Sequence, residues 1–125
     1  MPPLPSPACH ALVKTHHITS RKKVAQLRKA AGKLGCYALL RSGGCPGIMY
    51  CRGAPDAVQE WVATVHALRY KDYQLMMRPA TVESTRLGQI DHTPGLFEIG
   101  TVKGFANAME QDGLLEWWRH GMKFA

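Results

Sequence analysis

The sequence predicts an α+β protein with a ferredoxin-like βαββαβ order, in which a four-stranded antiparallel sheet carries two helices on one face. Two observations lead to this fold. Apolar residues recur at helical spacing in two segments, 21–35 and 56–68, and short β-type runs lie before, between and after these segments. A Gly/Pro cluster at 42–47 separates two of those runs as a hairpin turn would. Right-handed crossovers then place both helices on the same side of the sheet.

The first strand and helix are predicted from 12–18, "LVKTHHI", and from the basic segment that follows it. The hydroxyl of Ser20 is placed to cap the helix, and Gly35 is placed to end it. Val24, Leu27 and Ala31 fall on one helical face, so we expect that face to pack against the sheet.

The middle of the chain predicts a hairpin, a second helix and a fourth strand. Pro46 cannot donate a ladder hydrogen bond, so the second hairpin strand should begin after it, and Gly53 should close it. Asp56 is a cap or first-turn acid for a helix that carries Trp61 on its apolar face. The run 71–79, "KDYQLMMRP", is a strand stopped by Pro79.

The last third predicts a loop at 80–97 and then two helices, the first capped by Thr101 and ended near Gly113. Its apolar content indicates packing on the domain over part of the open sheet, with binding of a partner protein through Trp117 and Trp118 as the alternative. The predicted organisation is therefore a flexible tail at 1–10, a ferredoxin-like domain at 11–80, and a loop and helical C-terminal extension at 81–125 that packs on the domain.

Composition limits the cellular setting. No apolar run reaches the ~20 residues that a membrane helix needs, and the N-terminus does not have the pattern of a signal peptide. We therefore expect a nuclear or cytoplasmic protein that is not secreted, with its four cysteines as free thiols. A zinc site that mixes Cys9, His10, His16 and His17 is a minor alternative, because structural zinc ligands are usually more closely paired.

Positive charge is concentrated in the first third of the chain. The net charge is +7, and residues 1–35 contain seven Lys or Arg and no acid. Arg21, Lys22 and Lys23 stand at the start of a helix, where cations are unfavourable unless an anion is bound there. With Lys29 and Lys33 they form a candidate phosphate-binding surface; a solvated helix face is the alternative.

The sheet face without predicted helices is the second candidate surface. Tyr50 and Arg52 share that face by strand alternation, and His17 faces the same side with Thr15. His16 would then point into the core. Aromatic and Arg side chains on a sheet are typical of single-stranded RNA binding, although Tyr beside Arg is also common in ordinary sheets.

Motifs of enzymes are missing from the sequence. It contains no G-x-x-x-x-G-K-[ST], no G-x-G-x-x-G and no G-x-S-x-G. We therefore predict no catalytic residues, no metal, no cofactor, no small-molecule substrate and no membrane partner.

The segments "THHITSRKK" and "CPGIMYCRGAPDAVQEWVATVHALRYKDYQ" resemble a eukaryotic domain family. This family forms the C-terminal domain of a spliceosomal tri-snRNP pre-mRNA-processing factor and of RWD-domain-containing protein two, and the resemblance covers about residues 13–79. The tail from Phe97 looks like an extension of the fungal members. The resemblance implies a ferredoxin-like fold and, from the splicing factor, binding of small nuclear RNA.

The function predicted from the sequence is thus a non-enzymatic RNA-binding module. RNA phosphates would contact the five cations of the basic helix, and RNA bases or backbone would contact His17, Tyr50 and Arg52. The alternative is a protein-interaction module that uses the open sheet face or the aromatic tail.

Overall fold

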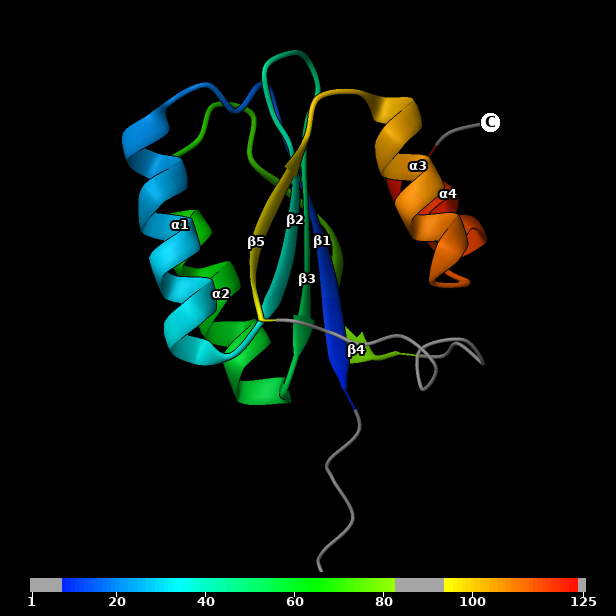
Figure 1. The fold of residues 1–125 in the computed structure, drawn as a ribbon, viewed down its shortest axis with the longest axis horizontal. Coiled ribbons are helices and arrows are strands. Elements are labelled where there is room, and N and C mark those ends of the chain that lie inside the picture. The colour runs from blue at the N-terminus through cyan, green and yellow to red at the C-terminus, as the bar shows by residue number, and fades with distance from the viewer. Residues whose placement is uncertain (1–7, 83–93, 124–125) are drawn as a thin grey trace, which may run out of the picture.

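The computed structural model describes residues 8–82 and 94–123, which form three layers. The sheet stands in the middle, helices α1 and α2 cover one face, and helices α3 and α4 cover the other (Figure 1). The strands are β1 (Cys9–Thr15), β2 (Tyr37–Arg41), β3 (Gly47–Gly53), β4 (Gln74–Thr81) and β5 (Gly95–Ile99). The helices are α1 (Arg21–Leu34), α2 (Pro55–Ala67), α3 (Val102–Gln111) and α4 (Leu115–Met122).

The βαββαβ core agrees with the predicted order, but the sheet is larger and mixed. Its strand order is β4-β1-β3-β2-β5, with β5 parallel to β2 and the other neighbours antiparallel. The predicted purely antiparallel sheet of four strands is therefore corrected. The strand β5 lies partly within the segment that we expected to be a loop. It pairs with β2 of the hairpin, although the two strands are far apart in the sequence, and it forms the edge of the sheet.

Local sequence features explain the helix ends. The Ser20 hydroxyl accepts a hydrogen bond of 3.2 Å from the Lys23 amide, and Gly35 ends α1 with a left-handed φ of 71°. The Thr101 hydroxyl accepts from the Gly104 amide at 2.9 Å, as predicted for the cap of α3. Asp56 lies in the first turn of α2, whose N-cap is Ala54.

Two strand boundaries differ from the prediction. Strand β1 runs from Cys9 to Thr15 and not over 12–18, so the two histidines follow the strand. Strand β4 continues through Pro79 to Thr81. Because β4 is an edge strand, a residue without an N–H can be accommodated in it.

The hydrophobic core has two parts, one on each face of the sheet. The helix-layer core lies between the sheet and α1 and α2, and Trp61 is its largest fully buried side chain. The cap-layer core lies between the sheet and α3 and α4, and it contains Phe105, Met109 and Trp118. The helices α3 and α4, called the cap below, therefore cover the sheet face that was predicted to be open.

Candidate functional site

A buried polar network lies between the sheet and the cap. The Arg52 guanidinium donates to the Asp112 carboxylate at 2.9 Å and to the Tyr50 hydroxyl at 3.3 Å. His10 Nδ1 and the Tyr50 hydroxyl are 2.9 Å apart, and the His10 ring stacks on Trp117 with centroids 3.9 Å apart. These contacts join β1 and β3 to α4 and to the turn between the two cap helices.

The predicted sheet-face site is corrected by this arrangement. Tyr50 and Arg52 share a face as alternation predicted, but they are 0% and 3% exposed. Trp118 is buried, and Trp117 packs against His10, so the aromatic tail covers this face of the sheet. Tyr50, Arg52 and Trp118 are therefore not accessible to an RNA base or to a partner protein in this structure, and Trp117 is partly buried with one ring face stacked on His10.

Burial changes the proton affinity of two groups in this network. Desolvation, helped by the nearby Arg52 charge, lowers the pKa of His10 to about 4. Burial also raises the pKa of Tyr50 well above its ordinary value. Both side chains are therefore neutral near pH 7, and the Arg52–Asp112 ion pair carries the charge of the network.

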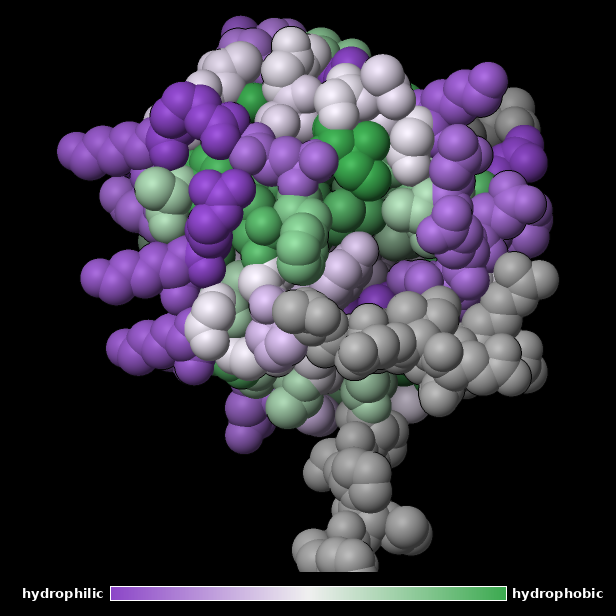
Figure 2. Space-filling view, viewed as in Figure 1, coloured by the Kyte–Doolittle hydropathy of each residue, from purple (hydrophilic) through white to green (hydrophobic). Residues whose placement is uncertain are grey.

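The basic helix divides into engaged and exposed cations. Arg21 donates two hydrogen bonds, of 2.8 and 2.7 Å, to the Glu98 carboxylate on β5. Arg28 and the Ser42 hydroxyl also donate to Glu98, and these donors, Arg21 first, lower the pKa of Glu98 to about 2. Lys22, Lys29 and Lys33 are exposed, and Figure 2 shows hydrophilic side chains projecting from the α1 side.

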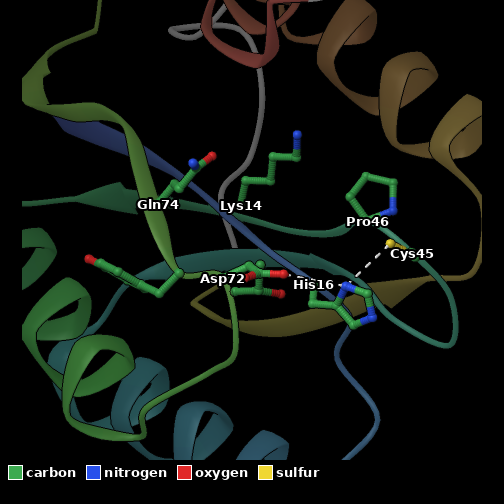
Figure 3. A pocket seen from close by; sticks show the side chains of 8 residues that line it. Lys14, His16, Cys45, Pro46, Asp72 and Gln74 are labelled. Carbon is green, nitrogen blue, oxygen red and sulfur yellow. Dashed lines mark hydrogen bonds and ion pairs between the residues drawn. The ribbon is translucent and has the colours of Figure 1, made fainter.

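Two pockets lie at the end of the sheet where β1 leads into α1. The pocket in Figure 3 has a volume of about 350 Å³ and holds Cys45, His16 and Asp72. His16 Nδ1 is 3.9 Å from the Cys45 sulfur and 3.5 Å from the Asp72 carboxylate. The predicted site residues His17 and Lys23 line the second, neighbouring pocket.

The Cys45, His16 and Asp72 side chains do not have the geometry of a catalytic triad. In a triad, one imidazole nitrogen faces the nucleophile and the other faces the orienting carboxylate. Here the same nitrogen, Nδ1, is nearest to both the thiol and the carboxylate. The His16 side chain is also 41% exposed, so the prediction that it lies in the core is wrong.

In the part of the chain that the structure describes, three or more His, Cys, Asp or Glu side chains nowhere gather in a way that could hold a metal ion. No helix within residues 8–82 and 94–123 has the length and apolar character needed to cross a bilayer.

Comparison with known proteins places the fold. No family model matches the chain, and no curated protein matches it. Among solved structures, BlrP1 BLUF is similar to this chain over 87% of this chain and 78% of its own length, with a TM-score of 0.58 and 14% identity. The chain has the fold of a BLUF domain. A second match is Klebsiella pneumoniae BlrP1 at pH 8.0 in a complex with calcium and cy-diGMP. Its TM-score is 0.60 at 13% identity, and the match covers 85% of this chain but only 28% of that one.

The BLUF-type fold overturns the predicted kinship with the splicing-factor domain. The matches include five-sixths or more of this chain, so they extend beyond the βαββαβ core that suggested the earlier resemblance. The inferred RNA-binding function depended on that resemblance and on an open sheet face. The fold matches contradict the first, and the buried Tyr50 and Arg52 contradict the second.

Proposed function

We propose that this chain is a non-enzymatic sensory domain of the BLUF type of fold. In this proposal the α3–α4 cap is the part that changes its conformation, by detaching from the sheet. The observation that carries the proposal is the extent of the structural likeness to BlrP1 BLUF. The likeness spans 87% of this chain, which is more than the sheet with α1 and α2 alone can supply. The BLUF domain of BlrP1 is a flavin-binding blue-light sensor.

The fold family raises the question of a flavin, and the helix layer is the first place to test for one. A flavin needs room for a planar tricyclic ring and polar groups that pair with the ring edge. Trp61 fills the space between the helices: it is 0% exposed, and its indole N–H donates to the Leu27 carbonyl of α1 at 3.2 Å. Among the described residues, the buried polar or charged side chains are His10, Thr15, Arg52 and Asp112, and none of them is Asn or Gln.

The cap layer does not fit a flavin either. Phe105 and Met109 of α3 are both fully buried there. The polar side chains of this layer, including Tyr50 and Arg52, already bond to one another and to Asp112. The residues present therefore do not fit an enclosed flavin, and the sensory role that we propose does not depend on one.

The cap has the features expected of a responding element. It rests on a core cluster of its own, separate from the helix-layer core, so it can detach without exposing Trp61 or the residues around it. Its attachment combines this apolar cluster with a small number of buried polar contacts, of which Arg52–Asp112 is an ion pair. Loss of such contacts costs free energy. A defined free-energy difference therefore separates the docked state of the cap from its released state.

Native-state hydrogen exchange tests the proposal. We expect the amides of Phe105, Met109 and Trp118 to exchange through an opening that costs less free energy than global unfolding. The amides of Leu12 and Met49 in the central strands serve as the internal control. Asp112→Asn should lower the opening free energy of the cap more than it lowers the opening free energy of the central strands. If cap and strand amides exchange only together, the cap is not a separate responding unit and the proposal fails.

A further inference from the structure

The pocket in Figure 3 brings together three ionisable side chains from separate parts of the chain. Cys45 comes from the turn between β2 and β3, His16 follows β1, and Asp72 precedes β4. Backbone hydrogen bonds join these segments: the Gly47 amide donates to the His16 carbonyl at 3.3 Å, and the His16 amide donates to the Lys71 carbonyl at 2.9 Å. The fold therefore holds the three side chains next to one another.

Cys45 is the accessible thiol of this group. It is the exposed one of the four cysteines, since Cys36 and Cys51 are buried and Cys9 is half-buried. Its sulfur lies 3.9 Å from His16 Nδ1, and Figure 3 shows the two side chains pointing toward each other. The thiolate is the nucleophilic form of cysteine, and a neighbouring imidazole can take the thiol proton. Cys45 is therefore placed to attack an electrophilic sulfur.

The position of His16 Nδ1 suits a thiolate better than it suits a catalytic triad. The same nitrogen lies 3.5 Å from the Asp72 carboxylate. Once Nδ1 has taken the Cys45 proton, it adjoins two anions, the thiolate and the carboxylate, and both favour the charged imidazole. Thiol–disulfide exchange needs a thiolate with open access, and it does not need the second imidazole nitrogen to be oriented.

The cavity beside Cys45 has room for a small ligand and groups that can bind a carboxylate. Its volume is about 350 Å³, which is at the lower end of the roughly 300–1,000 Å³ of small-molecule sites. Lys14 on β1 and Gln74 on β4 are paired neighbours in the sheet, and both line the cavity. An ammonium and a carboxamide can each donate hydrogen bonds to a carboxylate.

We propose that Cys45 is a site of thiol–disulfide exchange with a small disulfide that carries carboxylate groups. Cys45 gives its proton to His16 Nδ1, and its sulfur forms a bond to one sulfur of the disulfide. The original S–S bond breaks, its electron pair leaves with the second sulfur, and that thiolate takes up the proton from His16. Cys45 is thereby oxidised to a mixed disulfide, and the departing half of the reagent is reduced to a thiol. This site goes beyond the proposed sensory function, because it lies outside the cap.

Intact-mass spectrometry of the native full chain tests the proposal, with oxidised glutathione as the probe. We expect a single glutathionyl group on each chain, assigned to Cys45 by peptide mapping and removed by dithiothreitol. Cys45→Ser should abolish the adduct, although Cys9, Cys36 and Cys51 remain. Failure of the native chain to form the adduct, or modification of Cys9 at the same rate as Cys45, would overturn the proposal.

His16→Gln tests the role of the imidazole. It should slow modification of Cys45 about threefold or more, because the loss of thiolate is only partly offset by the greater intrinsic nucleophilicity of a less acidic thiol. His120→Gln, an exposed change on α4, should leave the rate unchanged. In urea both variants should react as fast as the unmodified chain, because the pocket no longer exists. Equal rates in the two native variants would remove His16 from the proposed step.

A comparison of two reagents tests the class of ligand. Bis(2-hydroxyethyl) disulfide has the same reacting bond as oxidised glutathione but no carboxylate. Lys14→Gln should slow the reaction with oxidised glutathione about two- to fivefold, the size expected for an ion pair near the surface, and should not slow the reaction with the neutral reagent. Lys33→Gln makes the same charge change at the far end of α1 and should slow neither reaction. Equal slowing of both reagents by Lys14→Gln, or of oxidised glutathione by both lysine variants, would overturn the carboxylate assignment.

Discussion

Arg52 on β3 donates a hydrogen bond of 2.9 Å to Asp112, the residue that ends α3, and both side chains lie beneath the cap. This ion pair joins two residues that are 60 positions apart in the chain. Strand alternation places the Arg52 cation on the sheet face that was predicted to be open. The ion pair instead buries this cation and attaches the C-terminal helices to the sheet.

Asp112→Ala should destabilise the protein strongly, because it leaves the Arg52 charge buried without its carboxylate partner. Loss of one partner of a buried pair costs about 3–5 kcal/mol, which is a large share of a typical stability of about 5–15 kcal/mol. Urea unfolding followed by tryptophan fluorescence measures the change.

Glu116→Ala is the control for Asp112→Ala, because it removes an exposed acid from the same cap. The double variant Arg52→Met/Asp112→Ala should lose less than the sum of the two single variants, since it leaves no buried charge alone. Equal effects of Asp112→Ala and Glu116→Ala would show that the ion pair does not hold the cap.

His10 makes stability depend on pH between about 6.5 and 4. Its pKa falls from 6.5 to about 4 on folding, so between these values the unfolded chain binds more protons than the folded chain. The contribution of His10 is therefore complete above pH 6.5 and is lost as the pH falls toward 4. The slope from this one group is at most about 1.4 kcal/mol per pH unit.

His10→Phe preserves the aromatic stack on Trp117 and removes the titrating group. Unfolding free energies measured from pH 7 to pH 4 should fall less steeply in this variant than in the unmodified protein. His120→Gln, an exposed change on α4, should keep the original slope. A slope that persists in His10→Phe would assign the pH dependence to another group.

Glu98 adds a second acid-sensitive contact at a lower pH. Its pKa falls from 4.5 to about 2 on folding, so its contribution is complete above pH 4.5 and is lost as the pH drops toward 2. Glu98→Gln should lower the free energy of unfolding at pH 7 by about 1 kcal/mol. It removes the negative charge that the donors bind, and the loss is modest because these donors lie near the surface. Glu60→Gln on the exposed face of α2 should change it little, and equal losses would argue against the Glu98 cluster.

The βαββαβ core could be predicted because its signals are local. Ser20 and Gly35 delimit α1, the glycines around Pro46 mark the hairpin, and Thr101 begins α3. The strand β5 was missed because it is only five residues long and pairs with β2 in parallel, far away in the sequence. Leu96 and Glu98 share one face of β5 and Phe97 and Ile99 share the other, so the segment has no regular alternation of apolar and polar residues that would have indicated a strand.

The sites were harder to predict because they depend on partners distant in the sequence. Nothing near Arg52 indicates Asp112, and nothing near Arg21 indicates Glu98. The basic start of α1 predicted a phosphate site there, and this stays a prediction. The sequence alone, however, could not show that the α2–β4 loop brings Arg69, Tyr70 and Lys71 to the same place.

The most direct test of the account is the visible absorption spectrum of the full chain. The protein is purified from cells supplied with riboflavin, then incubated with excess FAD or FMN, desalted, and measured before and after blue illumination. A BLUF-type fold filled by Trp61 on one face and by the cap on the other should retain no flavin and show no light-induced change. Flavin retained at close to one molecule per chain, with a spectral shift on illumination, would contradict the closed interior and assign the chain a flavin-dependent role.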